Sequence, residues 1–105
     1  RSLEGASFEN ANLEGASFKA ANLENACLVG ANLEDVNFIN ANLANVNLSS
    51  ANFCDALLMG ANLEGADFTD VKNLTVEQIK TAKNWDKGKY DPEFGELLGL
   101  LQEVA

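Results

Sequence analysis

The chain has 105 residues, enough for one domain with a modest hydrophobic core. Its 16 acidic and 7 basic residues give a formal net charge of -9 at pH 7, which disfavours direct binding to nucleic acid or to an anionic membrane. The sequence has no histidine, which excludes histidine metal sites, Ser-His-Asp triads and Cys-His dyads. We therefore expect a protein that is not an enzyme, with no catalytic residue, no metal site and no cofactor.

A five-residue repeat runs from the start of the chain to Asp70. Each unit has a central Leu or Phe, and the residue two positions earlier is Ala in eleven of the fourteen units. The residue directly before the centre is most often Asn. The central residues are Leu3, Phe8, Leu13, Phe18, Leu23, Leu28, Leu33, Phe38, Leu43, Leu48, Phe53, Leu58, Leu63 and Phe68.

A period of five fits neither an amphipathic helix nor a regular strand. A helix turns about 100° per residue, so successive centres would spiral around it and never form a face. Strict alternation over two residues fails as well. If each unit instead turns the chain by roughly 90°, four units close a square coil with every centre pointing to its axis. Stacked coils would then pair their backbones at the parallel-strand spacing of about 4.8 Å.

These A(N/D)LXX units resemble the pentapeptide repeat family over residues 2–70. The resemblance implies a mainly β fold, a right-handed quadrilateral parallel β-helix, which is a solenoid of about three and a half coils here. We expect residues 1–70 to form this β-helix and residues 71–105 to form a C-terminal helical cap. The tail resembles the endings of cyanobacterial and plastid members, which implies a photosynthetic lineage.

Residues twenty positions apart lie above one another in such a stack, so surface columns can be predicted. Two columns directly after the centres are acidic. Like charges at this spacing are mildly destabilising, although they can attract cations or a basic partner. The two acidic stripes are Glu4, Glu24 and Glu64 on the first face, and Glu14 and Glu34 on the third.

The fourth face carries apolar residues where the repeat elsewhere has polar ones. Ile39 and Met59 follow their centres, and Leu57 takes the place of the usual Asn. A contiguous exposed apolar patch is typical of an interaction surface. Three interpretations stay open: the C-terminal segment folds back over the patch, a partner or second copy binds it, or it is exposed without a function.

Cys27 and Cys54 are expected near different corners, one coil apart. A disulfide needs Cα atoms within about 7 Å, so we expect no intramolecular bond. Two free thiols fit a reducing compartment, which favours the cytoplasm, while the thylakoid lumen or periplasm stays open if a signal segment was removed. No apolar run is long enough to span a membrane, so we expect no membrane insertion.

Two helices are expected beyond Asp70, where polar Asn73 stands at the next centre. Thr75 and Gln78 form a capping-box signature, which predicts a first helix from about Val76 to Asn84. We expect the C-terminal segment to cover the ends of the core columns, anchored by the chain's single Trp and single Tyr. The covered centres are Leu58, Leu63 and Phe68, and the anchors are Trp85 and Tyr90.

The second predicted helix starts with Asp91 as N-cap and Pro92 as its first helical residue. Gly95 and Gly99 are expected to weaken it by about 1 kcal/mol each. Such a helix must pack on another element to be stable. Its apolar stripe is Phe94, Leu97, Leu98, Leu101 and Val104.

The sequence favours a non-enzymatic scaffold or protein–protein interaction module, whose partner is another protein. The alternative, which the resemblance implies, is an acidic DNA mimic that inhibits a type II topoisomerase such as gyrase, although the repeat is short for that role. No cap precedes Leu3. We therefore also expect the first coil to pair, either end to end with a second copy in a homodimer or with an upstream segment.

Overall fold

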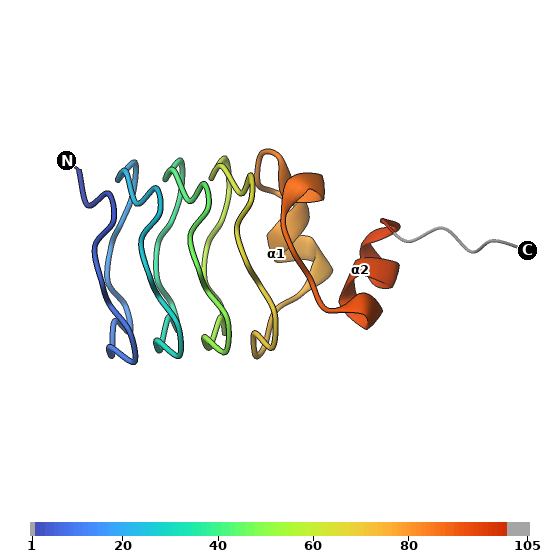
Figure 1. Ribbon diagram of the computed structural model, residues 1–105, viewed down its shortest axis with the longest axis horizontal. Helices are drawn as coiled ribbons and strands as arrows, with labels where there is room; N and C mark the ends of the chain where they lie inside the picture. Colours follow the sequence, from blue (N-terminus) through green and yellow to red (C-terminus); the bar gives the residue numbers. More distant parts are fainter. Residues whose placement is uncertain (1, 101–105) are drawn as a thin grey trace, which may run out of the picture.

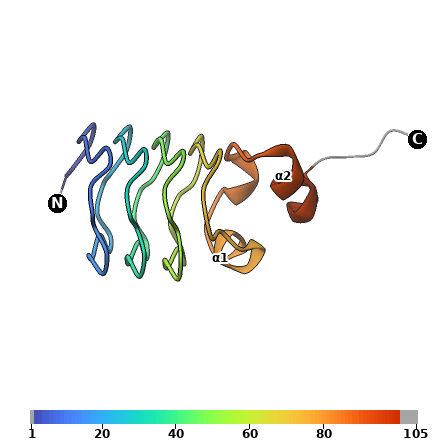
Figure 2. The ribbon, with the colours of Figure 1, turned by 90° about the horizontal axis from the view of Figure 1, so that it is seen from below.

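The computed structural model describes residues 2–100, and its regular part is a stack of four-sided coils (Figures 1 and 2). From Ser2 to Asn52, the residue before each centre forms a parallel β-bridge with the residue twenty positions later, as Ser2 does with Asn22 and Ser7 with Cys27. Each bridge is isolated, because a coil side is too short for a longer strand. The predicted β-helix fold is confirmed, and the side chains of one column lie above one another.

A tight turn closes every five-residue unit. Its hydrogen bond runs from the N–H three residues after the centre, as from Ala26 to the carbonyl of Leu23 at 2.9 Å. The residue two after the centre has a positive φ in all fourteen units. A type II turn requires this φ, which explains why Gly, Asn or Asp stands there in every unit except those ending at Ala20 and Ser50.

The central residues fill the axis of the stack. From Leu23 to Phe68 they are at most 2% exposed, whereas the centres of the first coil are only partly buried. Aromatic rings follow one another along the axis: Phe18 stacks on Phe38 at 5.7 Å, and Phe38 on Phe53 at 6.1 Å. Each buried Leu or Phe contributes roughly 1.5–3 kcal/mol, so these columns supply most of the stabilisation. End-to-end pairing of the first coil stays a prediction.

Asparagine side chains form two ladders that the repeat pattern alone did not reveal. Asn32 Nδ2 donates to Asn12 Oδ1 at 3.2 Å, and Asn42 Nδ2 to Asn22 Oδ1 at 3.3 Å. The ladders continue beyond the repeat into the C-terminal segment. Asn73 donates to Asn52, and Asn84 donates to Asn62, both at 2.8 Å. Asn73, where the repeat breaks, therefore still takes part in coil-to-coil contact.

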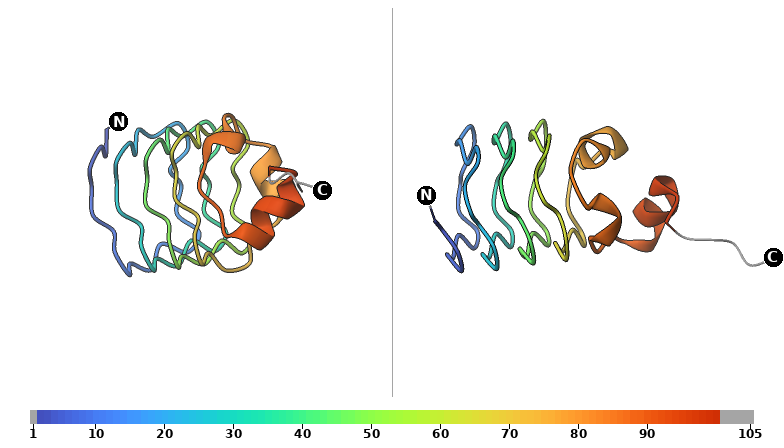
Figure 3. Two further views of the ribbon diagram at one scale, coloured as in Figure 1. Left: turned by 45° about the vertical axis from the view of Figure 1, so that its right-hand side comes forward. Right: turned by 90° about the horizontal axis from the view of Figure 1, so that it is seen from above.

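The C-terminal segment pairs with the last regular coil on three of its four sides. The bridges are Asn52 to Lys72, Asn62 to Lys83 and Asp67 to Lys89. On the fourth side, α1 (Val76–Lys80) takes the place of the next strand, and η1 (Trp85–Lys87) follows it. Figure 3 shows these helices and α2 (Pro92–Leu98) gathered at the C-terminal end of the stack.

Helix α1 begins as predicted but ends earlier. Gln78 N donates to Thr75 Oγ1 at 3.1 Å, and Thr75 N donates to Gln78 Oε1 at 2.8 Å, which completes the capping box. The predicted end at Asn84 is wrong, because the helix stops at Lys80. Lys83 must be extended so that its N–H reaches the carbonyl of Ala61 at 2.7 Å, and this coil pairing overrides helix propensity.

The start of α2 differs from the prediction in one respect. Pro92 is the first helical residue, but Asp91 makes no side-chain cap hydrogen bond. Its Oδ2 instead accepts a hydrogen bond from the N–H of Asp70 at 3.0 Å. Asp91 therefore ties α2 to the last regular turn of the repeat and does not cap the helix.

The end of α2 also differs from the prediction. Gly99 lies at the C-cap with φ 83°, so it ends the helix in the left-handed conformation that suits glycine and does not weaken its interior. Leu98 is buried, whereas Leu97 is 69% exposed and does not belong to the core. Phe94 is partly buried against the core. The other two members of the predicted stripe, Leu101 and Val104, lie outside the described residues.

The two expected anchors close the end of the core. Tyr90 stacks on Phe68 with ring centroids 5.4 Å apart and an interplanar angle of 9°. Its hydroxyl donates to the carbonyl of Trp85 at 2.6 Å, and Trp85 itself packs partly buried against the core. Ile79 of α1 is fully buried in the same cluster. The last centres of the repeat are thus covered by α1 and the segment that follows it.

Candidate functional site

The predicted apolar patch lies on the fourth face, whose centres are Phe18, Phe38 and Leu58. Leu57 is 50% exposed and Met59 is 60% exposed, while Ile39 is partly buried. Leu57 bridges back to Asn37 but, among residues 2–100, to no later residue, because α1 stands where the next strand would be. The patch therefore occurs where the regular ladder is interrupted.

A groove of about 230 Å³ lies between this face and α1. The groove is mainly apolar, with Glu77 and Gln78 on its helix side. The C-terminal segment borders the patch, but its described residues, 71–100, leave Leu57 and Met59 exposed and do not cover them. The groove is lined by Ile39, Ala56, Leu57, Leu58, Met59, Glu77, Gln78 and Thr81.

The side chain of Gln78 supplies hydrogen bonds where the backbone ladder is interrupted. Its Nε2 donates to the carbonyl of Phe53 at 2.8 Å and to that of Ala56 at 3.1 Å. The N–H of Gly60 donates to the carbonyl of Thr81 at 3.1 Å. These contacts hold α1 against the coil and fix the width of the groove. From the sequence, Gln78 is predictable only as part of a capping box.

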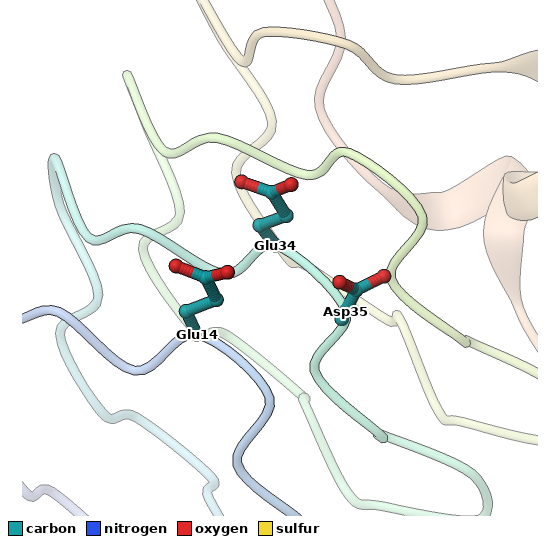
Figure 4. A group of neighbouring side chains, drawn as sticks. All are labelled: Glu14, Glu34 and Asp35. Atoms are coloured by element: carbon teal, nitrogen blue, oxygen red, sulfur yellow. The ribbon is translucent and has the colours of Figure 1, made fainter.

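The predicted stripe of Glu14 and Glu34 is joined by a third acid, Asp35 (Figure 4). One carboxylate oxygen from each of the three lies within 4.8 Å of the others. The repeat pattern did not predict Asp35 in this cluster, because Asp35 occupies the turn position with φ 59°, one residue beyond the acidic column. The cluster is a region of concentrated negative charge, and the absence of a metal site stays a prediction.

The second acidic stripe, on the first face, is more open. Glu4 and Glu64 are exposed, Glu24 is half-buried, and Ala44 separates Glu24 from Glu64. The backbone keeps these residues in one column, since Gly5 N donates to the carbonyl of Glu24 at 2.9 Å. This stripe is a solvated acidic face without converging side chains.

The two cysteines are free thiols in the structure. Cys54 lies one position beyond the third-face centre, and its Sγ is 3.7 Å from Asp55 Oδ2. Desolvation, and then the negative charges of Asp55 and Glu34, raise the pKa of the Cys54 thiol. A raised pKa keeps the group protonated near neutral pH, which lowers its nucleophilicity.

Neither α1 nor α2 approaches the length that a membrane-crossing helix needs, and the same holds for every helix within residues 2–100. The family comparison matches residues 1–77 to a model described as a pentapeptide repeat region. The comparison with curated proteins found no match.

Several solved structures resemble the chain. A pentapeptide repeat protein from the Arabidopsis thaliana thylakoid lumen is 42% identical, with a TM-score of 0.57, over 75% of this chain and 58% of that one. Rfr23, a pentapeptide repeat protein from the cyanobacterium Cyanothece 51142, is 32% identical, with a TM-score of 0.54, over 87% of this chain and 60% of that one. The match thus spans less than two thirds of either protein's length.

A third structure shares the fold alone. QnrB1, a plasmid-mediated fluoroquinolone resistance protein, is 18% identical, with a TM-score of 0.53, over 93% of this chain and 44% of that one.

Proposed function

This chain belongs to the pentapeptide repeat family, and we propose that it acts as a non-enzymatic scaffold that binds another protein. The observation that carries the proposal is the apolar patch of Ile39, Leu57 and Met59. Leu57 and Met59 are two of the three large hydrophobic side chains exposed among residues 2–100, the other being Leu97. Since they lie side by side on one groove, they offer a partner a continuous apolar contact.

The scaffold suits this role because backbone hydrogen bonds between successive coils hold the surface in place. About three and a half right-handed coils, closed by the C-terminal helices, support the patch from below. Phe38 and Leu58, the centres beneath it, are buried and at most 1% exposed. A surface that is already ordered loses little conformational entropy on binding, so a modest apolar contact can give useful affinity.

Capture from a cyanobacterial lysate tests the proposal. The immobilised chain is compared with an Ile39→Glu/Met59→Glu variant, which puts charge into the patch. A Val29→Glu variant is the control, because Val29 has the same place in its repeat unit but lies on the opposite face. A protein lost only with the patch variant supports the proposal. Equal recovery with all three, or no captured protein, overturns it.

An acidic DNA mimic that inhibits a type II topoisomerase is the second candidate. The three carboxylates of Glu14, Glu34 and Asp35, within 4.8 Å of one another on a convex face, favour it because they concentrate charge as DNA phosphates do. The short stack argues against it, since a long rod is needed to imitate a duplex. Inhibition of gyrase supercoiling at micromolar protein would support this candidate, and full activity would remove it.

A further inference from the structure

One rung of the backbone ladder is incomplete on the fourth face. Thirteen of the fourteen central residues donate their N–H to a carbonyl one coil further on, as Phe38 does to Leu57 and Leu63 does to Lys83. Leu58 is the exception, and within residues 2–100 its N–H has no backbone acceptor. Because the thirteen others all point towards the C-terminal end, the N–H of Leu58 points towards α1 and the groove that Leu58 lines.

The hydrogen-bonding groups on either side of this position are paired. The carbonyl of Ala56 accepts from Gln78 Nε2 at 3.1 Å, and the N–H of Gly60 donates to Thr81 at 3.1 Å. Leu58 is only 1% exposed, so bulk water has little access to its N–H, and an acceptor reaches this N–H only when the side chains that line the groove move apart. A buried donor without an acceptor costs about 1–3 kcal/mol, and an acceptor that enters the groove recovers this free energy.

The surroundings of the groove are acidic. Glu77 lines the groove itself, and Asp55 lines an adjoining hollow that shares Leu57, Ala56 and Gln78 with it. Negative charge continues past Asp55, where the Glu14, Glu34 and Asp35 carboxylates cluster on the same corner of the coil.

The nearby bases offset these acids only in part, because Lys80 on α1 and Lys72, which bridges to Asn52, stand against the five acids just named. The Lys80 ammonium lies 5.3 Å from the centre of the Trp85 ring, which engages it in a cation–π contact. Lys19 is on the fourth face but two coils away. The charge around the groove therefore favours a positively charged occupant.

We propose that the groove binds an extended segment of another protein in which one apolar residue is flanked by lysine or arginine. The apolar side chain packs on Leu57 and Met59, one backbone carbonyl accepts from the N–H of Leu58, and the basic side chains face Glu77 and Asp55. An extended segment fits because its carbonyls are free, whereas a helix uses its own internally. This inference rests on the proposed function and specifies the partner.

Two other occupants fit less well. A second copy of the chain carries the same net charge of -9 and would bring like charges together. Residues 101–105 contain one acid and no base, so they do not complement Glu77 and Asp55.

Residue-resolved amide hydrogen exchange on the free chain is the first test. The N–H of Leu58 is expected to exchange at least about tenfold faster than those of Phe38 and Leu63, which are equally buried but paired. If Leu58 is protected as strongly as these two, its donor is satisfied within the chain and the inference is overturned.

Selection from a library of extended peptides is the second test. The probes are about nine residues long, with leucine fixed at the centre and random residues elsewhere. We expect enrichment of lysine and arginine beside the leucine, and at least about tenfold slower exchange at Leu58 when a selected peptide binds. A Leu57→Glu/Met59→Glu variant should select nothing, while Val29→Glu should select as the unmodified chain does.

The outcomes separate this inference from the proposed function. The proposed function stands if a lysate partner depends on the patch. The inference is nevertheless overturned if the selected peptides are not enriched in lysine and arginine, or if the exchange rate of the Leu58 N–H does not change when a peptide binds. Dimerisation through the patch, or slower exchange at Leu58 only when residues 101–105 are present, also overturns it. If the lysate yields no partner and the library yields no binding peptide, both the proposed function and this inference are overturned.

Discussion

The Nε2 atom of Gln78 donates to the carbonyl of Ala56 at 3.1 Å, in the place where the regular coils have a backbone N–H from the next coil. On the preceding coil of the same face, that donor is the N–H of Leu57, which reaches Val36 at 2.9 Å. One side chain thus substitutes for one strand residue. This contact lets a helix replace a strand at the end of the stack without leaving the carbonyl of Ala56 unpaired.

A Gln78→Glu variant should separate the two roles of this residue. Glutamate can still accept from the N–H of Thr75, but it cannot donate to Phe53 and Ala56. The free energy of unfolding should fall by about 1–3 kcal/mol, since two hydrogen bonds are lost and a charge is placed near two carbonyls. Urea denaturation followed by Trp85 fluorescence measures it. The control is Gln78→Glu/Glu77→Gln, which keeps the net charge of the unmodified chain, and unchanged stability in both variants would contradict the account.

Tyr90 predicts a specific loss of stability at high pH. Burial, and then the negative charge of Asp86, raise the pKa of Tyr90 above its ordinary value of 10.0. The folded chain therefore keeps this proton at a pH where the unfolded chain releases it. Its contribution to stability is complete below pH about 10 and declines as the pH rises further.

A Tyr90→Phe variant checks this prediction. At neutral pH the free energy of unfolding of the variant should be about 1 kcal/mol lower, because the 2.6 Å hydrogen bond to the carbonyl of Trp85 is removed. Above pH about 10, its free energy of unfolding should fall less steeply than that of the unmodified chain. Tyr90 is the single tyrosine, so phenolate absorbance reports it directly. Ionisation before unfolding, at the pH of a free tyrosine, would show that the ring is not buried as described.

Gly60 should tolerate alanine less well than Gly15 does. Both have a positive φ, at 72° and 74°, so the backbone strain of an added Cβ is matched. At Gly60 the Cβ would collide with the side chain of Asn40, whereas at Gly15 it would meet nothing within 4 Å. In thermal unfolding, Gly60→Ala should lower the free energy of unfolding by about 1 kcal/mol more than Gly15→Ala does.

A double variant provides the control for this steric effect. Asn40→Gly should remove the extra loss in Gly60→Ala, because the colliding side chain is gone and glycine keeps the positive φ of 60°. Equal losses for Gly60→Ala and Gly15→Ala would mean that Asn40 moves aside freely.

Glu34→Gln should stabilise the chain at low salt. Its carboxylate lies within 4.8 Å of those of Glu14 and Asp35, so neutralising it removes like-charge repulsion of about 0.2–1 kcal/mol. The gain should shrink as the salt concentration rises. Glu93→Gln, at an exposed position of α2, is the control, and it should change the free energy of unfolding little. A gain that does not depend on salt would argue against an electrostatic cause.

The architecture of the repeat was predictable because fourteen units keep one frame. The period fixed which residues point inward, and Leu23 to Phe68 are buried as expected. The acidic column of Glu14 and Glu34 followed from the same register. Asp35 and the positive φ of every turn were not deduced, although Gly, Asn and Asp at each fifth position were a visible signal for them.

The C-terminal segment was predicted less well because it has no repeat. The capping box of Thr75 and Gln78 and the position of Pro92 are local signals, and both were confirmed. The early end of α1 depends on pairing between Lys83 and the coil, which no local pattern reveals. The groove depends on the same pairing, since it exists where α1 displaces a strand.

Amide hydrogen exchange of the chain with and without its captured partner tests the central claim most directly. The account predicts that slower exchange is confined to the fourth face, at Ile39 and Leu57 to Met59, and to the adjoining residues of α1. Exchange rates on the opposite face, measured at Leu28 and Leu48, should be the same with and without the partner. Protection on that opposite face, or on the acidic stripes alone, would contradict the claim that the apolar patch is where this protein binds its partner.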